Sequence, residues 1–294
     1  MATIPGGQFR LTAHETVNAV ETRTGTGLQG AVGGDFNVEV FVGLAANAPT
    51  TAAHGFNGLA VLSPSGHELD LVSGKFAATD NGGGHDTISA FGSGETVSGG
   101  AALVSLNLYG AHDTVNGGSG ADTINVYGAH DTVNGGSGND TINVYGAHDT
   151  VNGGSGQDTI DVYGAHDTVN GGSGADTINV YGAHDGVVIG TGHDTVNVAG
   201  SHDTVSAGNG GGSLISFGGS HETFADAASS YADTVVGFNQ SAGDRIQLAG
   251  TDTVAHALAD SRQVNGGHDT LITLNDGSSI LLKGISSINS HFFS

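Results

Sequence analysis

The stretch that decides the fold is Gly117-Gly118-Ser119-Gly120-Ala121-Asp122-Thr123-Ile124-Asn125. It returns nearly unchanged at 135–143, 153–161 and 171–179, so the period is 18. Between the copies runs a second phrase, Tyr-Gly-Ala-His-Asp, with the same period, from Tyr109 to its last copy at Tyr181. Half of the period also repeats, because an aspartate falls every nine residues from Asp113 to Asp203. A fixed short period of this kind predicts a solenoid.

Each nine-residue unit reads as a turn followed by a short strand. Side chains alternate along a strand, so Ile124 and Val126 are expected to face inward and Thr123 and Asn125 outward. Two turns and two strands would close one coil in each period, and equivalent residues would stack about 4.8 Å apart. The sequence therefore predicts an all-β fold, a parallel β-roll or β-solenoid with about 18 residues per coil, which is two nonapeptides.

The composition excludes several partners. The formal net charge of −23, with 6 Lys and Arg, argues against nucleic acid and anionic membrane surfaces. The chain has no cysteine, so disulfides and thiolate metal sites are impossible. No apolar run approaches the length of about 18 residues that a membrane span needs, so no transmembrane segment is expected.

Changes in the repeat divide the chain into three regions. Residues 1–80 lack the nine-residue period and show short alternating runs between turn residues, which predicts a β-rich N-terminal cap or head domain. Residues 81–220 are expected to form the β-roll. The register slips at His221-Glu222, so residues 221–294 are expected to form a C-terminal β cap.

If residues 18 apart stack, aspartates form a charged column on one side of the roll. Unit charges about 4.8 Å apart repel by roughly 1 kcal/mol in water and by several times that near a protein surface. The column must therefore be protonated, splayed or bridged by cations. Glycine-rich turns expose carbonyl oxygens, and carboxylate and carbonyl oxygens together are the ligands that Ca²⁺ prefers.

The nonapeptides resemble the GGxGxDxUx repeat of the RTX (repeats-in-toxin, haemolysin-type) calcium-binding family. The resemblance implies a right-handed parallel β-roll with at least three Ca²⁺ ions between successive glycine-rich turns. Upstream, Gly99-Gly100-Ala101-Ala102-Leu103-Val104 has lost the aspartate, so no full site is expected there. The implied metal positions are Gly117, Gly118, Gly120, Asp122, Gly135, Gly136, Gly138, Asp140, Gly153, Gly154, Gly156, Asp158, Gly171, Gly172, Gly174, Asp176 and, in a partial turn, Gly190, Gly192 and Asp194.

The turns on the other side depart from the family motif. Val126-Tyr127-Gly128-Ala129-His130 lacks two glycines that favour positive φ, so this turn must differ. Three interpretations stay open: a solvated ladder in which each aspartate caps its own turn, cation binding here too, and a histidine response to pH or transition metals. The tyrosines are expected to stack between coils. The candidate cation ligands on this side are Asp113, Asp131, Asp149, Asp167 and Asp185.

The C-terminal region resembles that of RTX proteins exported by type I secretion. The resemblance rests on Asp233-Thr234-Val235-Val236-Gly237-Phe238-Asn239 and on Asp269-Thr270-Leu271-Ile272-Thr273-Leu274-Asn275-Asp276-Gly277. It implies the type I secretion machinery as a partner and an extracellular or cell-surface location. Residues 1–8 lack the basic and apolar segments of a Sec signal peptide, which agrees with such a route. The acidic repeat would then fold on extracellular calcium, because metal-binding free energy becomes folding free energy.

Two classes of function follow from these patterns. No Gly-X-Ser-X-Gly or His-Glu-X-X-His motif is present, so an enzyme is not expected. One hypothesis is a secreted, calcium-binding structural protein that self-assembles into a surface layer, an extracellular matrix or a filament. The alternative is an extracellular binding module, for ice or for glycans, that uses the flat Thr-X-Asn faces of the roll.

Overall fold

The computed structural model describes residues 93–101, 103–227 and 232–294 and, upstream of these, the strands between residues 8 and 90. The chain divides into two compact units, residues 1–150 and 151–294. No helix among the described residues is long and apolar enough to cross a bilayer.

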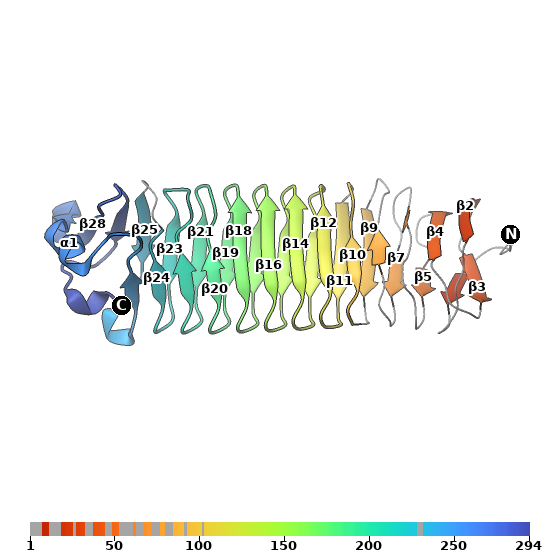
Figure 1. Ribbon diagram of the computed structural model, residues 1–294, viewed down its shortest axis with the longest axis horizontal. Helices are drawn as coiled ribbons and strands as arrows, with labels where there is room; N and C mark the ends of the chain where they lie inside the picture. The colour runs from red at the N-terminus through yellow and green to blue at the C-terminus, as the bar shows by residue number, and fades with distance from the viewer. Residues whose placement is uncertain are drawn as a thin grey trace. The chain divides into compact units, whose positions relative to one another are not determined.

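Unit 1 is built from parallel strands that alternate between two sheets (Figure 1). The even-numbered strands pair in the order β14-β12-β10-β8, with β8 (Ala77–Thr79), β10 (Thr96–Ser98), β12 (Thr114–Gly118) and β14 (Thr132–Ser137). The odd-numbered strands pair in the order β15-β13-β11-β9-β7-β5, with β5 (Pro49–Ala52), β7 (Glu68–Leu71), β9 (His85–Ala90), β11 (Leu103–Leu108), β13 (Thr123–Val126) and β15 (Thr141–Val144). Two smaller parallel sheets lie in the first 62 residues, β1 (Gln8–Leu11) with β3 (Leu28–Val32), and β2 (Ala19–Gly25) with β4 (Val38–Leu44) and β6 (Val61–Leu62).

The register of unit 1 confirms that one coil equals one period of the sequence repeat. Thr114 pairs with Thr132 in one sheet, and Ile124 pairs with Ile142 in the other. The predicted side-chain alternation is also confirmed, because Ile124 and Val126 are fully buried while Thr123 is exposed. A thin aliphatic core therefore lies between the two sheets, as the period-2 pattern requires.

Unit 2 repeats this architecture. Its even-numbered strands are β16 (Thr150–Ser155), β18 (Thr168–Ser173), β20 (Gly186–Val188), β22 (Thr204–Ser206), β24 (Thr223–Ala225) and β26 (Arg245–Gln247). Its odd-numbered strands are β17 (Thr159–Val162), β19 (Thr177–Val180), β21 (Thr195–Val198), β23 (Leu214–Phe217) and β25 (Ala232–Val236).

Parallel pairing in unit 2 extends past residue 220, where the sequence period is lost. Thr204 pairs with Thr223, and Thr223 pairs in turn with Arg245. The sequence separation between partners on successive coils therefore grows from 18 to 19 and then to 22. The strands keep their register because the additional residues lie in the turns between them.

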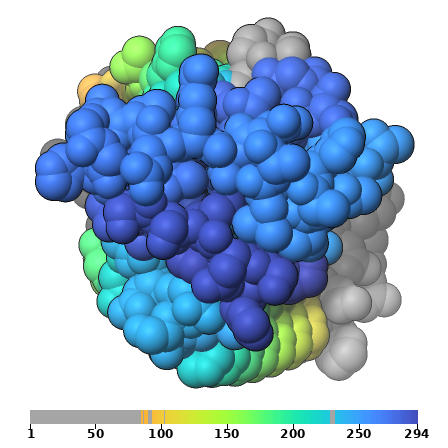
Figure 2. Space-filling view, turned by 90° about the vertical axis from the view of Figure 1, so that its left-hand side faces the viewer, coloured from red at the N-terminus to blue at the C-terminus, as the bar shows by residue number. Residues whose placement is uncertain are grey.

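The end of unit 2 is closed by a small mixed structure. It contains η1 (Gln240–Ala242), α1 (Val254–Ala259), β27 (Arg262–Val264), η2 (Asn265–Gly267), β28 (Asp269–Thr273), β29 (Ser279–Leu282) and η3 (Ser290–Phe292). Strand β29 pairs parallel with β25 and antiparallel with β28, across a turn at Asn275-Asp276-Gly277. The ring of Phe292 stacks on Phe238 at 5.6 Å. Figure 2 looks onto this end, whose surface is formed by the last segments of the chain.

Candidate metal centres

The turns lie along two edges of each unit, and the two edges differ in sequence. We call the turns with Gly-Gly-Ser-Gly-X-Asp the glycine edge and the turns with Tyr-Gly-Ala-His-Asp the tyrosine edge. Each turn ends in an aspartate that directly precedes a strand, as Asp122 precedes β13 and Asp131 precedes β14.

Aspartates of successive coils are joined in a ladder on both edges. On the glycine edge of unit 1, the Asp122 N–H donates to Asp140 Oδ1 at 2.7 Å. On the tyrosine edge, the Asp113 N–H donates to Asp131 Oδ1, also at 2.7 Å. Unit 2 has the same contact from Asp176 N to Asp194 Oδ1, at 2.8 Å. Each carboxylate therefore binds the backbone of the preceding coil.

The second carboxylate oxygen of the ladder is buried without a hydrogen-bond partner among the described residues. This holds for Oδ2 of Asp122, Asp176 and Asp194 on the glycine edge and of Asp113 and Asp131 on the tyrosine edge. These aspartates are at most 2% exposed. A buried acceptor without a partner costs about 1–3 kcal/mol, and more when it is charged. A bound proton or cation would therefore stabilise these buried Oδ2 atoms.

The pKa values of the ladder aspartates also indicate that these carboxylates need a proton or a cation. The pKa of Asp122 and that of Asp176 are raised to about 6. Desolvation is the largest cause; a backbone N–H hydrogen bond partly opposes it, and the charges of neighbouring aspartates add to it. On the tyrosine edge, desolvation raises the pKa of Asp131 to about 7. Without a cation the ionised ladder is therefore unfavourable near neutral pH.

Glycines of the glycine edge leave room where oxygens of two coils converge. A Cβ on Gly117 would lie 2.7 Å from Asp122 Oδ2 and 2.4 Å from the Gly135 carbonyl oxygen. Gly118 has φ 112°, and a Cβ there would lie 1.9 Å from the Gly100 carbonyl oxygen. Carboxylate and carbonyl oxygens of adjacent coils thus share one small space. This donor set of hard oxygens fits Ca²⁺.

Within unit 1, successive glycine-edge turns stack in the register of the repeat, since Gly118 pairs with Gly136. The partial turn has the backbone of a full one, because Gly190 and Gly192 have φ 105° and 142°, against 102° and 142° for Gly172 and Gly174. Upstream, Val104 stands in the aspartate position and donates its N–H to Asp122 Oδ1 at 2.8 Å. The ladder on this edge therefore has no carboxylate at that step.

The tyrosine edge has a different turn, as predicted, but its positive φ falls on a histidine. His130 has φ 62°, and the equivalent histidines have φ between 61° and 64°. The ring of His112 stacks on that of His130 with centroids 5.0 Å apart, and Tyr109 stacks on Tyr127 at 4.9 Å, which confirms the predicted tyrosine stacking. The interpretation of a solvated aspartate ladder on this edge is wrong, because Asp131 is 1% exposed and binds the neighbouring coil.

Sequence reasoning missed how far both ladders extend. On the glycine edge, the Asp194 N–H donates to Ser213 Oγ, and the Ser213 N–H donates to Asp233 Oδ1. On the tyrosine edge, the Asp203 N–H donates to Glu222 Oε2 at 3.0 Å. The sequence signal for this extension is Ser220-His221-Glu222, which has a histidine followed by an acidic residue as in the other turns of this edge. It was missed because Glu222 lies 19 residues after Asp203, in place of the usual 18. His221 has φ 61°, as the other histidines of this edge have.

A separate acidic group lies at the end of unit 2. Carboxylate oxygens of Asp226, Asp252 and Asp276 lie within 4.8 Å of one another. The pKa of Asp226 is raised to about 7. Desolvation is the largest cause, and the negative charges of Asp276 and Asp252 add to it. The three residues come from distant turns, so no sequence pattern could have grouped them.

Known proteins share this repeat. Residues 109–142 and 143–178 match the family model of the RTX calcium-binding nonapeptide repeat (4 copies). A search of curated proteins finds no match.

Two solved structures are similar to the chain. One is a hyperactive, Ca²⁺-dependent, β-helical antifreeze protein from an Antarctic bacterium, with 20% identity and a TM-score of 0.47 over 85% of this chain and 83% of that chain. The other is the extracellular lipase LipA from Serratia marcescens, with 13% identity and a TM-score of 0.29. The match spans 85% of this chain but 39% of the lipase. By the family match, residues 109–178 resemble RTX calcium-binding nonapeptide repeats, and the structure places them in a parallel β-solenoid.

Proposed function

We propose that this chain is an extracellular, calcium-stabilised β-solenoid whose outward threonine and asparagine rows bind the surface of ice. The observation that carries the proposal is the regular grid of these side chains. Within a strand, Thr114 and Asn116 are two residues apart, which is about 6.7 Å. Across strands, Thr114 pairs with Thr132 and Asn116 with Asn134, at a spacing of about 4.8 Å.

The grid offers hydroxyl and amide groups that can donate to and accept from water. Its members have fixed positions because inward neighbours such as Val115 and Val133 are buried in the core. A rigid array of polar groups can order bound water at low entropic cost, because the array itself loses no further freedom. An ice surface is a repeating ligand that such an array could recognise.

Calcium has a structural role in the proposal. The residues that would hold it are the glycine-edge positions of the four full turns and the partial turn, with Asp122, Asp140, Asp158, Asp176 and Asp194 as the carboxylates. Bound Ca²⁺ would supply the positive charge that the buried Oδ2 atoms lack. Asp122, Asp140, Asp176 and Asp194 also accept N–H groups of the preceding coil, so they hold the strands in register. The proposal includes no catalytic step.

The function is tested by an ice-recrystallisation assay with purified protein. Protein in calcium should keep ice crystals small at micromolar concentration, and the same protein in chelator should not, since the grid needs a folded solenoid. A folded, calcium-loaded protein that leaves recrystallisation unchanged would remove the proposed function.

A second candidate function is self-assembly into a layer, matrix or filament. It is favoured by the exposed tyrosine column, in which Tyr109, Tyr127 and Tyr181 are 46–50% exposed. Exposed aromatic rows of this kind are typical of contact surfaces. Light scattering and electron microscopy at high concentration with calcium test it, and a protein that stays monomeric excludes it.

Extracellular function requires an export route, and the proposed route is type I secretion through the C-terminal region. RTX repeats are typical of secreted bacterial proteins, which supports the location. The structure buries Phe292 and Phe293 in the end of unit 2, so the terminus has a packing role as well. Deletion of residues 221–294 should retain the protein inside cells that carry a type I transporter, and continued export of that deletion would exclude the route.

A further inference from the structure

We infer that the two faces of unit 1 have different roles: the face of β10, β12 and β14 binds the ligand, and the face of β9, β11, β13 and β15 stabilises the fold. This inference rests on the proposed ice-binding function and assigns it to one sheet. Both faces carry Thr-X-Asn in sequence, so the sequence alone does not separate them. The exposure of the outward side chains does, together with the hollow and the asparagine hydrogen bonds of the β9–β15 face.

On the β9–β15 face, the asparagines bond to one another. Asn125 Nδ2 donates to Asn107 Oδ1 at 2.9 Å, and Asn143 Nδ2 donates to Asn125 Oδ1 at 2.8 Å. All three side chains are half-buried. An interior amide such as Asn125 therefore uses one donor and one acceptor along the row. Side-chain ladders of this kind stabilise flat parallel sheets, and they leave fewer groups for an external ligand.

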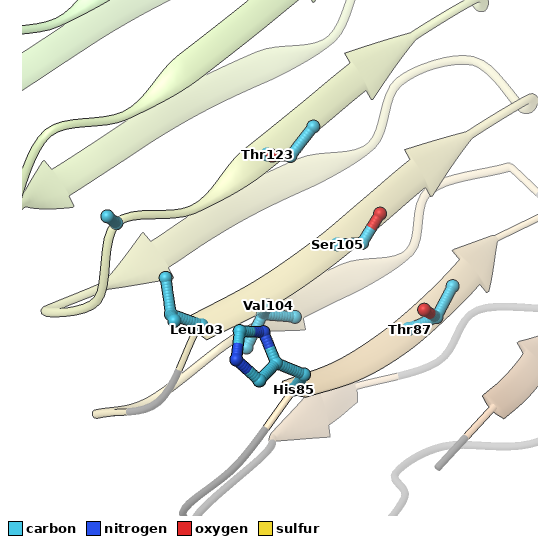
Figure 3. Close-up of a pocket in the computed structure, with 7 residues that line it drawn as sticks. His85, Thr87, Leu103, Val104, Ser105 and Thr123 are labelled. Atoms are coloured by element: carbon cyan, nitrogen blue, oxygen red, sulfur yellow. The ribbon is translucent and has the colours of Figure 1, made fainter. Parts of the chain in front are cut away.

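The β9–β15 face is also uneven at its upstream end. A hollow of about 270 Å³ lies there, bordered by His85, Leu103 and Thr123 among others. Leu103 is 37% exposed. Figure 3 shows Leu103 and His85 beside the row formed by Thr87, Ser105 and Thr123. A projecting apolar side chain next to a hollow interrupts the grid, so a flat crystalline surface would contact this face poorly.

The β10–β14 face is more regular and more accessible. Thr96, Thr114 and Thr132 stand in one row, joined by strand pairing, and all three are exposed. The second row pairs Ser98 with Asn116 and Asn116 with Asn134. In this second row Asn116 is exposed while Ser98 and Asn134 are half-buried, whereas Asn107, Asn125 and Asn143 of the other face are all half-buried. More of the hydroxyl and amide groups here are therefore accessible to water.

Matched substitutions on the two faces test the assignment. Thr132→Tyr and Thr123→Tyr both replace an exposed threonine at the start of a strand, one on each face, directly after a ladder aspartate. Circular dichroism in calcium first establishes that each variant is folded. Thr132→Lys and Thr123→Lys form a second pair, with a flexible side chain, in case the aromatic variants fold poorly.

We expect Thr132→Tyr and Thr132→Lys to weaken inhibition of ice recrystallisation by about tenfold, and the Thr123 variants to keep the activity of the parent. Equal losses on both faces, or a loss confined to the Thr123 variants, would overturn the face assignment while the proposed function stands. An inactive but folded parent would overturn both. The outcomes of the two failures are therefore distinguishable.

Discussion

Removing calcium and raising the pH from about 5 to about 8 should unfold the repeat region. In the folded state, desolvation raises the pKa of buried ladder aspartates from 3.8 to about 6 for Asp122, Asp176 and Asp203 and to about 7 for Asp131. The folded chain therefore binds more protons than the unfolded chain between about pH 4 and pH 7. Since stability falls with pH wherever the folded state binds more protons, metal-free protein should lose stability across this window.

The magnitude follows from the same values. For Asp122, the difference between 3.8 and about 6 corresponds to about 3 kcal/mol. Exposed residues such as Ala121 and Thr123 flank these buried aspartates, so nearby water screens part of the ladder charge, and we use about 1–2 kcal/mol for each of the four aspartates. Together they oppose folding by about 4–8 kcal/mol above pH 7, which approaches the entire stability of a typical domain.

The assay is urea unfolding of metal-free protein, followed by circular dichroism at pH 5, 6, 7 and 8. The urea midpoint should fall steadily with pH and reach zero or nearly zero at pH 8. In saturating calcium the trend should reverse, because only ionised carboxylates bind the ion. Asp122→Asn should reduce the slope in metal-free protein, and the exposed Asp260→Asn serves as the control. A metal-free protein as stable at pH 8 as at pH 5 would refute the electrostatic argument.

Substitutions at three further positions test the geometry of the coil. Gly128→Ala should destabilise the calcium-loaded protein by at least about 2 kcal/mol in thermal unfolding, since its Cβ would lie 1.4 Å from the Gly110 carbonyl oxygen; an unchanged Tm would contradict the close approach of the coils. His130 has φ 62°, so His130→Gly should leave the free energy of unfolding nearly unchanged and His130→Val should lower it by about 1–2 kcal/mol. Equal urea midpoints for the two variants would argue against the left-handed turn. Ile142→Ala, at a fully buried position, should cost about 2–5 kcal/mol in urea unfolding, and a smaller loss would mean that the core is looser than the structure indicates.

The fold was predictable because two local patterns agree. The period of the repeat gives the coil, and the alternation of Thr123-Ile124-Asn125-Val126 gives the inward and outward faces. Both depend only on strand geometry, which the chain repeats without variation. Downstream of residue 220 the period fails, although the strands still pair, because the turns absorb the insertions between Glu222 and Asp244.

The tyrosine edge was less predictable. The sequence indicated that two glycines were missing, but not that His130 would adopt the left-handed conformation. Histidine is one of the few residues enriched there, and the column of histidines was the available signal. The burial of Asp131 could not be read from the sequence, because it depends on how closely successive coils stack. The pairing of asparagines on one face also depends on three-dimensional contacts.

The most direct test of the account is a calcium titration of metal-free protein at neutral pH, followed by circular dichroism. We predict little β-sheet signal without calcium, a saturable increase with calcium, and a midpoint that rises by about tenfold in Asp176→Asn. Asp161→Asn is the matched control, since Asp161 lies on the outward face and its Oδ1 accepts from Asn179 Nδ2; its midpoint should equal that of the parent. A full β-sheet signal in metal-free protein at neutral pH, or equal midpoints for Asp176→Asn and Asp161→Asn, would contradict calcium-dependent folding through the glycine edge.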